Sequence, residues 1–149
     1  MKWKIKKSKE HYSRINEFSD QFFDAIYEND FELAKILIDD GKVNVNITND
    51  SGDTPLIAVC QQTTLKTEED ADKFINYLWQ NGSKVKKSND FGKTAMPYAK
   101  SNGMTKIVQT LEYIQWTIVY DMTVYARHVY YEITMNIVVE NISSMGKGE

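Results

Sequence analysis

The sequence contains few of the residues that build disulfide-held, metal-dependent or membrane-spanning proteins. Its 149 residues include one cysteine, two histidines and two prolines. Cys60 has no partner for an internal disulfide, which excludes a small secreted fold held together by bridges. His11 and His128 are far apart and make no zinc-type spacing, so we expect no metal site.

Long apolar runs are also absent. None approaches the roughly 18–20 residues that span a bilayer. The basic start, residues 1–9, is not followed by the apolar stretch of a signal peptide. We therefore expect a soluble protein of a reducing, cytoplasmic compartment.

The residues that are present have the composition of one globular domain. Hydrophobic residues make up 42% of the chain and charged residues 26%, which excludes wholesale disorder. The net charge of −3 is unevenly distributed: residues 1–10 and 73–106 are rich in lysine, whereas residues 17–72 hold fourteen acids and three lysines. We expect an acidic and a basic end, either as solvated faces or as a polar surface that orients a partner. The acidic block disfavours nucleic-acid binding.

Two segments repeat the same turn and helix start. Residues 49–52 and 89–92 both read Asn-Asp-x-Gly, a pattern typical of a tight turn. Thr54 and Thr94 follow each glycine by two positions and are predicted helix N-caps. An apolar second-helix pattern recurs at 33–37, 74–78 and 107–111, with spacings of 41 and 33 residues, which indicates a base period of 33 and one insertion.

These features resemble the ankyrin repeat, which has a period of about 33 residues, a β-turn followed by two helices, and a Thr-Pro-Leu-His-x-Ala signature. Ile57 and Pro97 stand where that signature has histidine. The resemblance covers about residues 20–114 and implies a mainly α fold, an ankyrin-like helix-turn-helix stack. An insertion at residues 63–69 is predicted to be a surface loop or a helix extension, with contact to a partner as an alternative.

The flanks lie outside this resemblance. Residues 1–19 are predicted to form a basic N-terminal arm and a capping helix. Residues 115–142 are rich in β-branched and aromatic residues that alternate with a change of phase near residue 127, which predicts a two-stranded β appendage. A helix is the alternative, with one apolar stripe at Leu111, Ile114, Ile118, Met122, Tyr125 and Val129. Residues 143–149 are predicted to be a disordered tail.

No set of residues indicates catalysis or cofactor binding. Cys60 falls in the first helix of the second repeat and is expected to be a buried structural thiol. The acids at 68–70 lie at a predicted helix start, where they favour the helix dipole. Residues 92–94 lack the upstream glycine of a phosphate-binding loop. We therefore expect no enzyme activity and no cofactor.

The resemblance implies that the chain binds another protein through the concave face that turn tips and first helices form in this family. The acidic stretch at residues 17–72 further predicts a partner with a basic surface. Alternatives are a small inhibitor or immunity-type protein that blocks one toxic or defensive enzyme, and a structural homodimer paired through the C-terminal strands. Nucleic acid and membrane are not expected partners. The predicted contact residues are Asp24, Tyr27, Glu28, Asp50, Ser51, Asp53, Gln61, Gln62, Asp90, Phe91, Lys93, Ser101 and Asn102.

Overall fold

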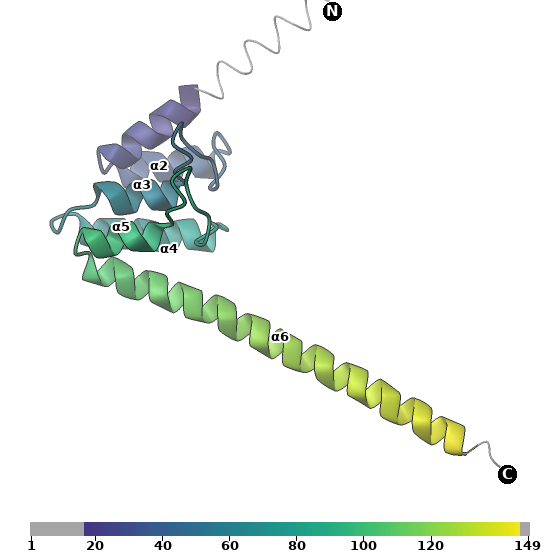
Figure 1. The fold of residues 1–149 in the computed structure, drawn as a ribbon. Helices are drawn as coiled ribbons and strands as arrows, with labels where there is room; N and C mark the ends of the chain where they lie inside the picture. The colour runs from purple at the N-terminus through teal and green to yellow at the C-terminus, as the bar shows by residue number, and fades with distance from the viewer. Residues whose placement is uncertain (1–16, 147–149) are drawn as a thin grey trace, which may run out of the picture. The chain divides into compact units, whose positions relative to one another are not determined.

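The computed structural model describes residues 17–146, which form helices and connecting loops with no strand among them. The helices are residues 17–27, α2 (Phe31–Asp39), α3 (Pro55–Gln62), α4 (Glu68–Gln80), α5 (Ala95–Ser101) and α6 (Thr105–Met145), shown in Figure 1. The chain divides into two compact units, Met1–Leu111 and Glu112–Glu149. None of the helices in the described part is long and apolar enough to cross a bilayer.

The first unit is a stack of three helix-turn-helix repeats, which confirms the predicted repeat. The first helices of the second and third repeats, α3 and α5, pack against each other, and the second helices α2 and α4 do the same. Large apolar side chains between these layers are fully buried, among them Phe22, Leu56, Phe74 and Ile107. The rings of Phe31 and Phe74 stack with centroids 4.9 Å apart, which joins successive second helices.

Short-range signals in the sequence account for the helix boundaries. Thr54 precedes α3, and its hydroxyl accepts the Ile57 N–H at 3.3 Å as a side-chain cap. Thr94 occupies the same position before α5 but makes no side-chain cap bond. Thr67 precedes α4 and instead accepts the N–H of Thr64 at 3.1 Å, which organises the loop between α3 and α4. The insertion is therefore mostly a loop and not an extension of α3.

The prediction of a two-stranded β appendage over residues 115–142 is wrong, because α6 runs through this whole segment. β-branched residues lower helix propensity only slightly, and no glycine or proline interrupts residues 115–142 to end a helix. Hydroxyl groups bond back to the preceding turn, as in the Thr117 hydroxyl donating to the Tyr113 carbonyl at 2.9 Å. The helical alternative was the correct one.

The remaining terminal predictions fall partly outside the described residues. The basic arm and most of the capping helix lie within residues 1–16, outside the described part, while residues 17–27 are helical. The helix α6 includes Ser143–Met145, which the sequence analysis placed in a disordered tail. Residues 147–149 lie outside the described part.

Candidate functional site

Two turn loops precede the first helices of the second and third repeats, and we call residues 41–54 finger one and residues 82–94 finger two. One asparagine side chain organises the tip of each. The Asn49 carboxamide oxygen accepts the N–H groups of Ser51 and Asp53, at 3.0 and 2.9 Å. Asn89 does the same for residues 91 and 93, at 3.1 and 3.0 Å. The identical bonds explain why the Asn-Asp-x-Gly pattern recurs.

The two fingers are joined directly to each other. The Asp90 N–H donates to the Ser51 carbonyl at 3.1 Å, and the Asn89 amide donates to the Asp53 carboxylate at 2.7 Å. Further along the fingers, the Asn46 amide donates to the Gly82 carbonyl at 3.0 Å. These bonds hold the two tips in one register, so that they present a single preorganised surface.

A hollow of about 770 Å³ lies between helix 17–27 and the tip of finger one. Its lining includes an aromatic ring, because Tyr27 is 37% exposed there. The Tyr27 hydroxyl accepts the Asn49 side-chain amide at 2.9 Å, which attaches the helix to the finger. The residues that line the hollow are Ser19, Asp20, Phe23, Asp24, Tyr27, Thr48, Asn49, Asp50 and Ser51.

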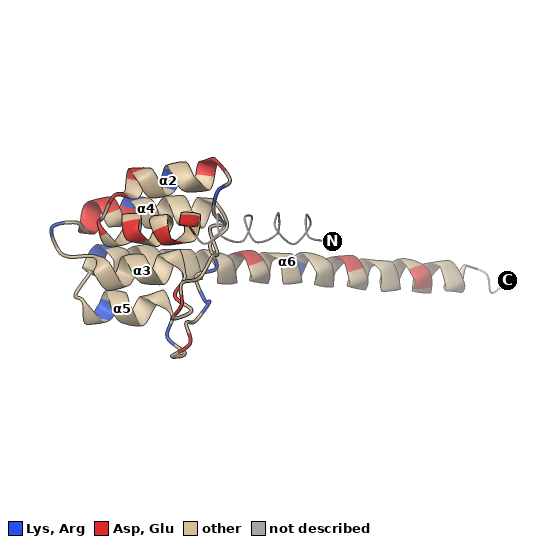
Figure 2. Cartoon of the chain, turned by 90° about the horizontal axis from the view of Figure 1, so that it is seen from above, with Lys and Arg blue, Asp and Glu red and all other residues tan. Residues whose placement is uncertain are grey.

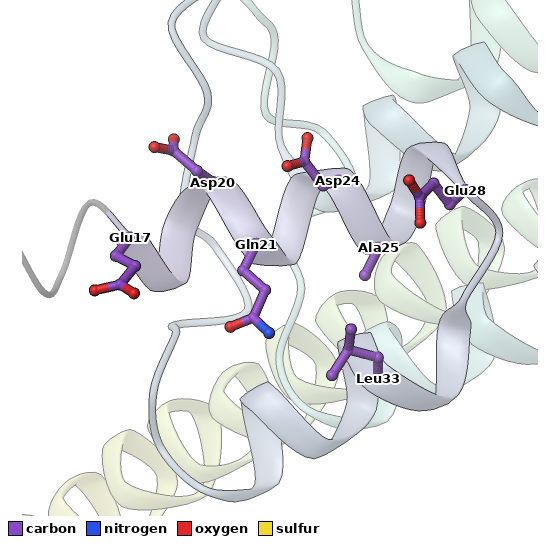
Figure 3. Close-up of a pocket in the computed structure, with 7 residues that line it drawn as sticks. All are labelled: Glu17, Asp20, Gln21, Asp24, Ala25, Glu28 and Leu33. Carbon is purple, nitrogen blue, oxygen red and sulfur yellow. The ribbon is translucent and has the colours of Figure 1, made fainter.

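A second, more open hollow of about 880 Å³ lies along the same helix, on the side of α2. Figure 3 shows that Gln21 and Ala25 point toward α2, whereas the Asp20 and Asp24 carboxylates point to the opposite side. Glu17 and Glu28 complete the acidic lining. Neither hollow is lined by a lysine or an arginine. The outer surface of helix 17–27 is thus a row of exposed carboxylates, which we call the acidic row: Glu17, Asp20, Asp24 and Glu28.

The structure brings together only part of the predicted contact set. Asp24, Tyr27, Asp50 and Ser51 line the 770 Å³ hollow. Glu28 directly follows helix 17–27 and lines the other hollow.

The tip of finger two carries three more of the predicted residues, all exposed: Asp90, Phe91 and Lys93. Phe91 is 73% exposed. The Lys93 ammonium lies 5.6 Å from the centre of the Tyr98 ring.

Other predicted contact residues serve the stack itself. Asp53 is only 5% exposed and its carboxylate accepts from Asn89, so it is not free to meet a partner. The Asn102 amide donates to the carbonyls of Cys60 and Gln61, at 2.9 and 3.3 Å, and so satisfies the C-terminal end of α3. Gln62 and Ser101 are exposed near these helix ends.

Sequence reasoning missed two features of this surface. Asp20 lines both hollows but is not among the predicted contact residues; its spacing of four residues from Asp24 is the signal that places both on one helix face. Leu65, at the loop between α3 and α4, is 75% exposed. An apolar residue inside a polar insertion is the signal that could have identified it.

The single cysteine lies in the core, as expected for a structural thiol. Cys60 is completely buried, and burial raises the pKa of its thiol to about 12, which keeps it protonated and unreactive. Among residues 17–146, no three or more histidine, cysteine, aspartate or glutamate side chains are placed to hold a metal ion.

The repeats of the first unit are similar to those of known proteins. A family model described as ankyrin repeats (3 copies) matches residues 22–117. A crystal structure of EF0377, an ankyrin repeat protein, is similar with a TM-score of 0.54 and 27% identity, over 59% of this chain and 43% of the other.

A second solved structure is similar in fold, with a TM-score of 0.53 and 20% identity over 62% of this chain and 45% of that one. It is described as the Bd0816 predatory endopeptidase from Bdellovibrio bacteriovorus in complex with immunity protein Bd3460. This chain thus spans less than half the length of either matched structure. Among curated proteins, none matches the sequence.

Proposed function

The chain belongs to the ankyrin-repeat family, and from this premise we propose that it binds a protein partner through one particular face. Ankyrin repeats indicate a protein–protein interaction module, and no catalytic family is indicated. The proposed face consists of helix 17–27 and the tips of the two fingers. Such a face is rigid and extended, because each repeat is held by its neighbours.

The 770 Å³ hollow carries this proposal. Its lining combines Tyr27 with Asp24 and Asp50 and contains no basic side chain. A tyrosine in a hollow supplies a large, rigid contact with little loss of side-chain entropy. The surrounding acids favour a partner that presents lysine or arginine, and they accelerate the encounter of the two proteins.

Phe91 extends the same face to finger two. An exposed phenylalanine on a rigid tip is the type of residue that contributes most of the binding energy when a partner covers it. The Asp90 N–H donates to the Ser51 carbonyl, so a backbone hydrogen bond joins the two tips. We therefore expect the partner to contact both fingers together.

Affinity capture with matched variants tests this proposal. The face variant is Asp24→Lys with Asp50→Lys, and the control variant is Asp40→Lys with Asp70→Lys. All four acids are exposed and the charge change is identical, but Asp40 and Asp70 belong to the second-helix side of the repeats. We expect the unchanged chain and the control to capture the same stoichiometric partner, and the face variant to lose it.

The partner captured in this way is then titrated at increasing salt concentration. An acidic face predicts that affinity falls as salt rises, since exposed charges are screened. The proposal is contradicted if the control variant loses the partner and the face variant keeps it, or if Phe91→Ala together with the face variant leaves the affinity unchanged.

An inhibitor or immunity-type role is a second candidate. The observation that favours it is the similar fold found in a structure that contains an endopeptidase and an immunity protein. If the captured partner is an enzyme, this candidate predicts that one equivalent of the chain abolishes its activity. An adaptor role predicts that the activity is unchanged.

A further inference from the structure

The second unit has an exposed apolar stripe along α6. Tyr113, Trp116, Tyr120 and Val124 follow one another at spacings of three, four and four residues, and the spacing continues to the end of the helix. Residues so spaced lie on one side of an α-helix. We call this set the α6 stripe: Tyr113, Trp116, Tyr120, Val124, Tyr131, Met135, Val138, Ile142 and Met145.

Every side chain of the α6 stripe is exposed, with exposed fractions between 48% and 82%. Since an aromatic side chain has 150–250 Å² to bury, the stripe presents roughly 1,000 Å² of surface, against the roughly 800 Å² that each partner buries in a stable complex. Figure 2 shows few charged residues along α6. A contiguous exposed apolar surface of this size is typical of an interaction site.

The opposite side of α6 carries a shorter apolar stripe. It follows the same spacing and then reaches the polar residues Asn141 and Ser144; its members are Val119, Met122, Ala126, Tyr130, Ile133 and Ile137. The large side chains of this set are also exposed. The opposite stripe extends over 19 residues, whereas the α6 stripe extends over 33 residues and is the longer of the two in the described part of the unit.

We propose that the α6 stripe is the contact surface for a second copy of this chain, with the two helices antiparallel. The two ends of the stripe match when it is read in the reverse direction. Tyr113 and Trp116 match Met145 and Ile142 about a midpoint at residue 129, and Tyr120 matches Val138 in the same way. An antiparallel pair consequently places large apolar residues opposite one another at both ends, while Val124 and Met135 face threonines nearer the middle.

Charge selects the antiparallel arrangement. Arg127 lies on the stripe, between Val124 and Tyr131, and is its one cation. In a parallel pair, Arg127 meets Arg127 of the other copy in an apolar interface, which is unfavourable. In an antiparallel pair, Arg127 faces Tyr131 of the other copy, where a guanidinium and an aromatic face attract each other. Antiparallel helix dipoles add to this preference.

Spacing also indicates how the two helices pack. From Tyr113 to Met135 the stripe follows a pattern of three, four and four residues, which is an 11-residue repeat. Such a repeat averages 3.67 residues per turn, close to the 3.6 of a straight helix, and does not impose the left-handed supercoil of a heptad repeat. The proposed dimer therefore consists of two nearly straight helices and differs from a leucine-zipper type of pair.

The mass of the full chain in solution tests the proposal, measured by light scattering over a range of concentrations. We expect the dimer at twice 17.3 kDa, dissociating at low concentration. The stripe variant is Tyr120→Lys with Tyr131→Lys, and the control is Tyr125→Lys with Tyr130→Lys, which changes two equally exposed tyrosines off the stripe. We expect the stripe variant to be monomeric and the control to remain dimeric, with unchanged helicity by circular dichroism.

Disulfide trapping tests the orientation. A chain carrying Tyr113→Cys is mixed with a chain carrying Met145→Cys under oxidation, while the buried Cys60 stays unreactive. The antiparallel pair predicts predominantly the mixed disulfide, and a parallel pair predicts disulfides between identical chains. A full chain that is monomeric at every concentration overturns the proposal, as does a control variant that dissociates with the stripe variant, or a monomer that binds neutral lipid vesicles through α6.

Discussion

At the scale of single residues, the conformation of the fingers depends on two asparagines and one glycine. Asn49 and Asn89 hold the two tips, and Gly52 lies where finger two comes closest to finger one. Gly52 has a φ of +72°, and a Cβ built there would lie 2.9 Å from the Asp90 nitrogen. Gly92 has the same φ with open space around it. A substitution at Gly92 therefore tests backbone conformation alone, whereas a substitution at Gly52 also tests the contact between the fingers.

Alanine substitution at these glycines measures the two costs. We expect Gly92→Ala to lower the free energy of unfolding by about 1 kcal/mol, the usual cost of a left-handed conformation for alanine. Gly52→Ala has this cost and also pushes on the backbone of finger two, so we expect a loss of at least about 2 kcal/mol. Urea unfolding followed by circular dichroism checks both; equal losses would show that the fingers do not pack as described.

Tyr77 gives the stack a specific alkaline response. Its hydroxyl donates to the Asp39 carboxylate at 2.5 Å, linking α4 to α2. Burial and this carboxylate raise the pKa of Tyr77 from 10 to about 12. The folded state therefore holds the phenol proton more tightly than the unfolded state, and this stabilisation is complete below pH 10 and lost as the pH rises from 10 to 12.

Tyr77→Phe tests that assignment. We expect a loss of about 1 kcal/mol at neutral pH, since the hydrogen bond to Asp39 is removed. The decline in stability between pH 10 and 12 should be shallower in the variant than in the unchanged chain, as measured by urea unfolding at each pH. An identical decline in both would assign the alkaline response to other groups.

At the scale of helices, the sequence predicted the repeats well and the C-terminal segment badly, for physical reasons that differ. Turn and cap signals such as Asn49, Thr54 and Gly82 act over two or three residues, so they are visible in the sequence. Strand and helix propensities in residues 115–142 differ by only tenths of a kcal/mol per residue, and uninterrupted helical hydrogen bonding outweighed them. The absence of glycine and proline from residues 115–142 predicts the helix better than the residue propensities do.

Contacts between distant residues were the part that no local pattern could predict. Glu68, expected to favour only the start of its own helix, also reaches the start of α6. Its carboxylate accepts the N–H groups of Lys106 and Ile107, at 2.7 and 3.2 Å. The neighbouring Glu69 forms an ion pair with the Lys106 ammonium, which lowers the pKa of Glu69 and raises that of Lys106. The two adjacent acids thus play different roles at one helix start.

Alanine at each of these two positions distinguishes the roles. Glu68→Ala leaves two N–H groups at the start of α6 without their acceptor, and we expect a loss of about 1–2 kcal/mol, as for a lost helix cap. Glu69→Ala removes only an exposed ion pair, and we expect a smaller loss than for Glu68→Ala. Thermal or urea unfolding compares them, and a larger loss at Glu69 would contradict the capping role of Glu68.

At the scale of the whole chain, the two units present surfaces of different chemistry. The repeats carry the acidic row and the finger tips, whereas the described part of the second unit carries the apolar α6 stripe. Charge asymmetry along the sequence predicted an acidic region, but the hollow beside Tyr27 depends on a bond between residues 22 positions apart. The account thus assigns recognition of a partner to the repeats and self-association to α6.

Hydrogen–deuterium exchange of the full chain, alone and saturated with its captured partner, tests the central claim most directly. Backbone amides buried at an interface exchange more slowly, and the method localises them along the chain. The account predicts new protection in residues 20–28, 48–53 and 90–93, with α2 and α4 unchanged. New protection confined to α2 and α4, or to residues 112–145, would contradict it.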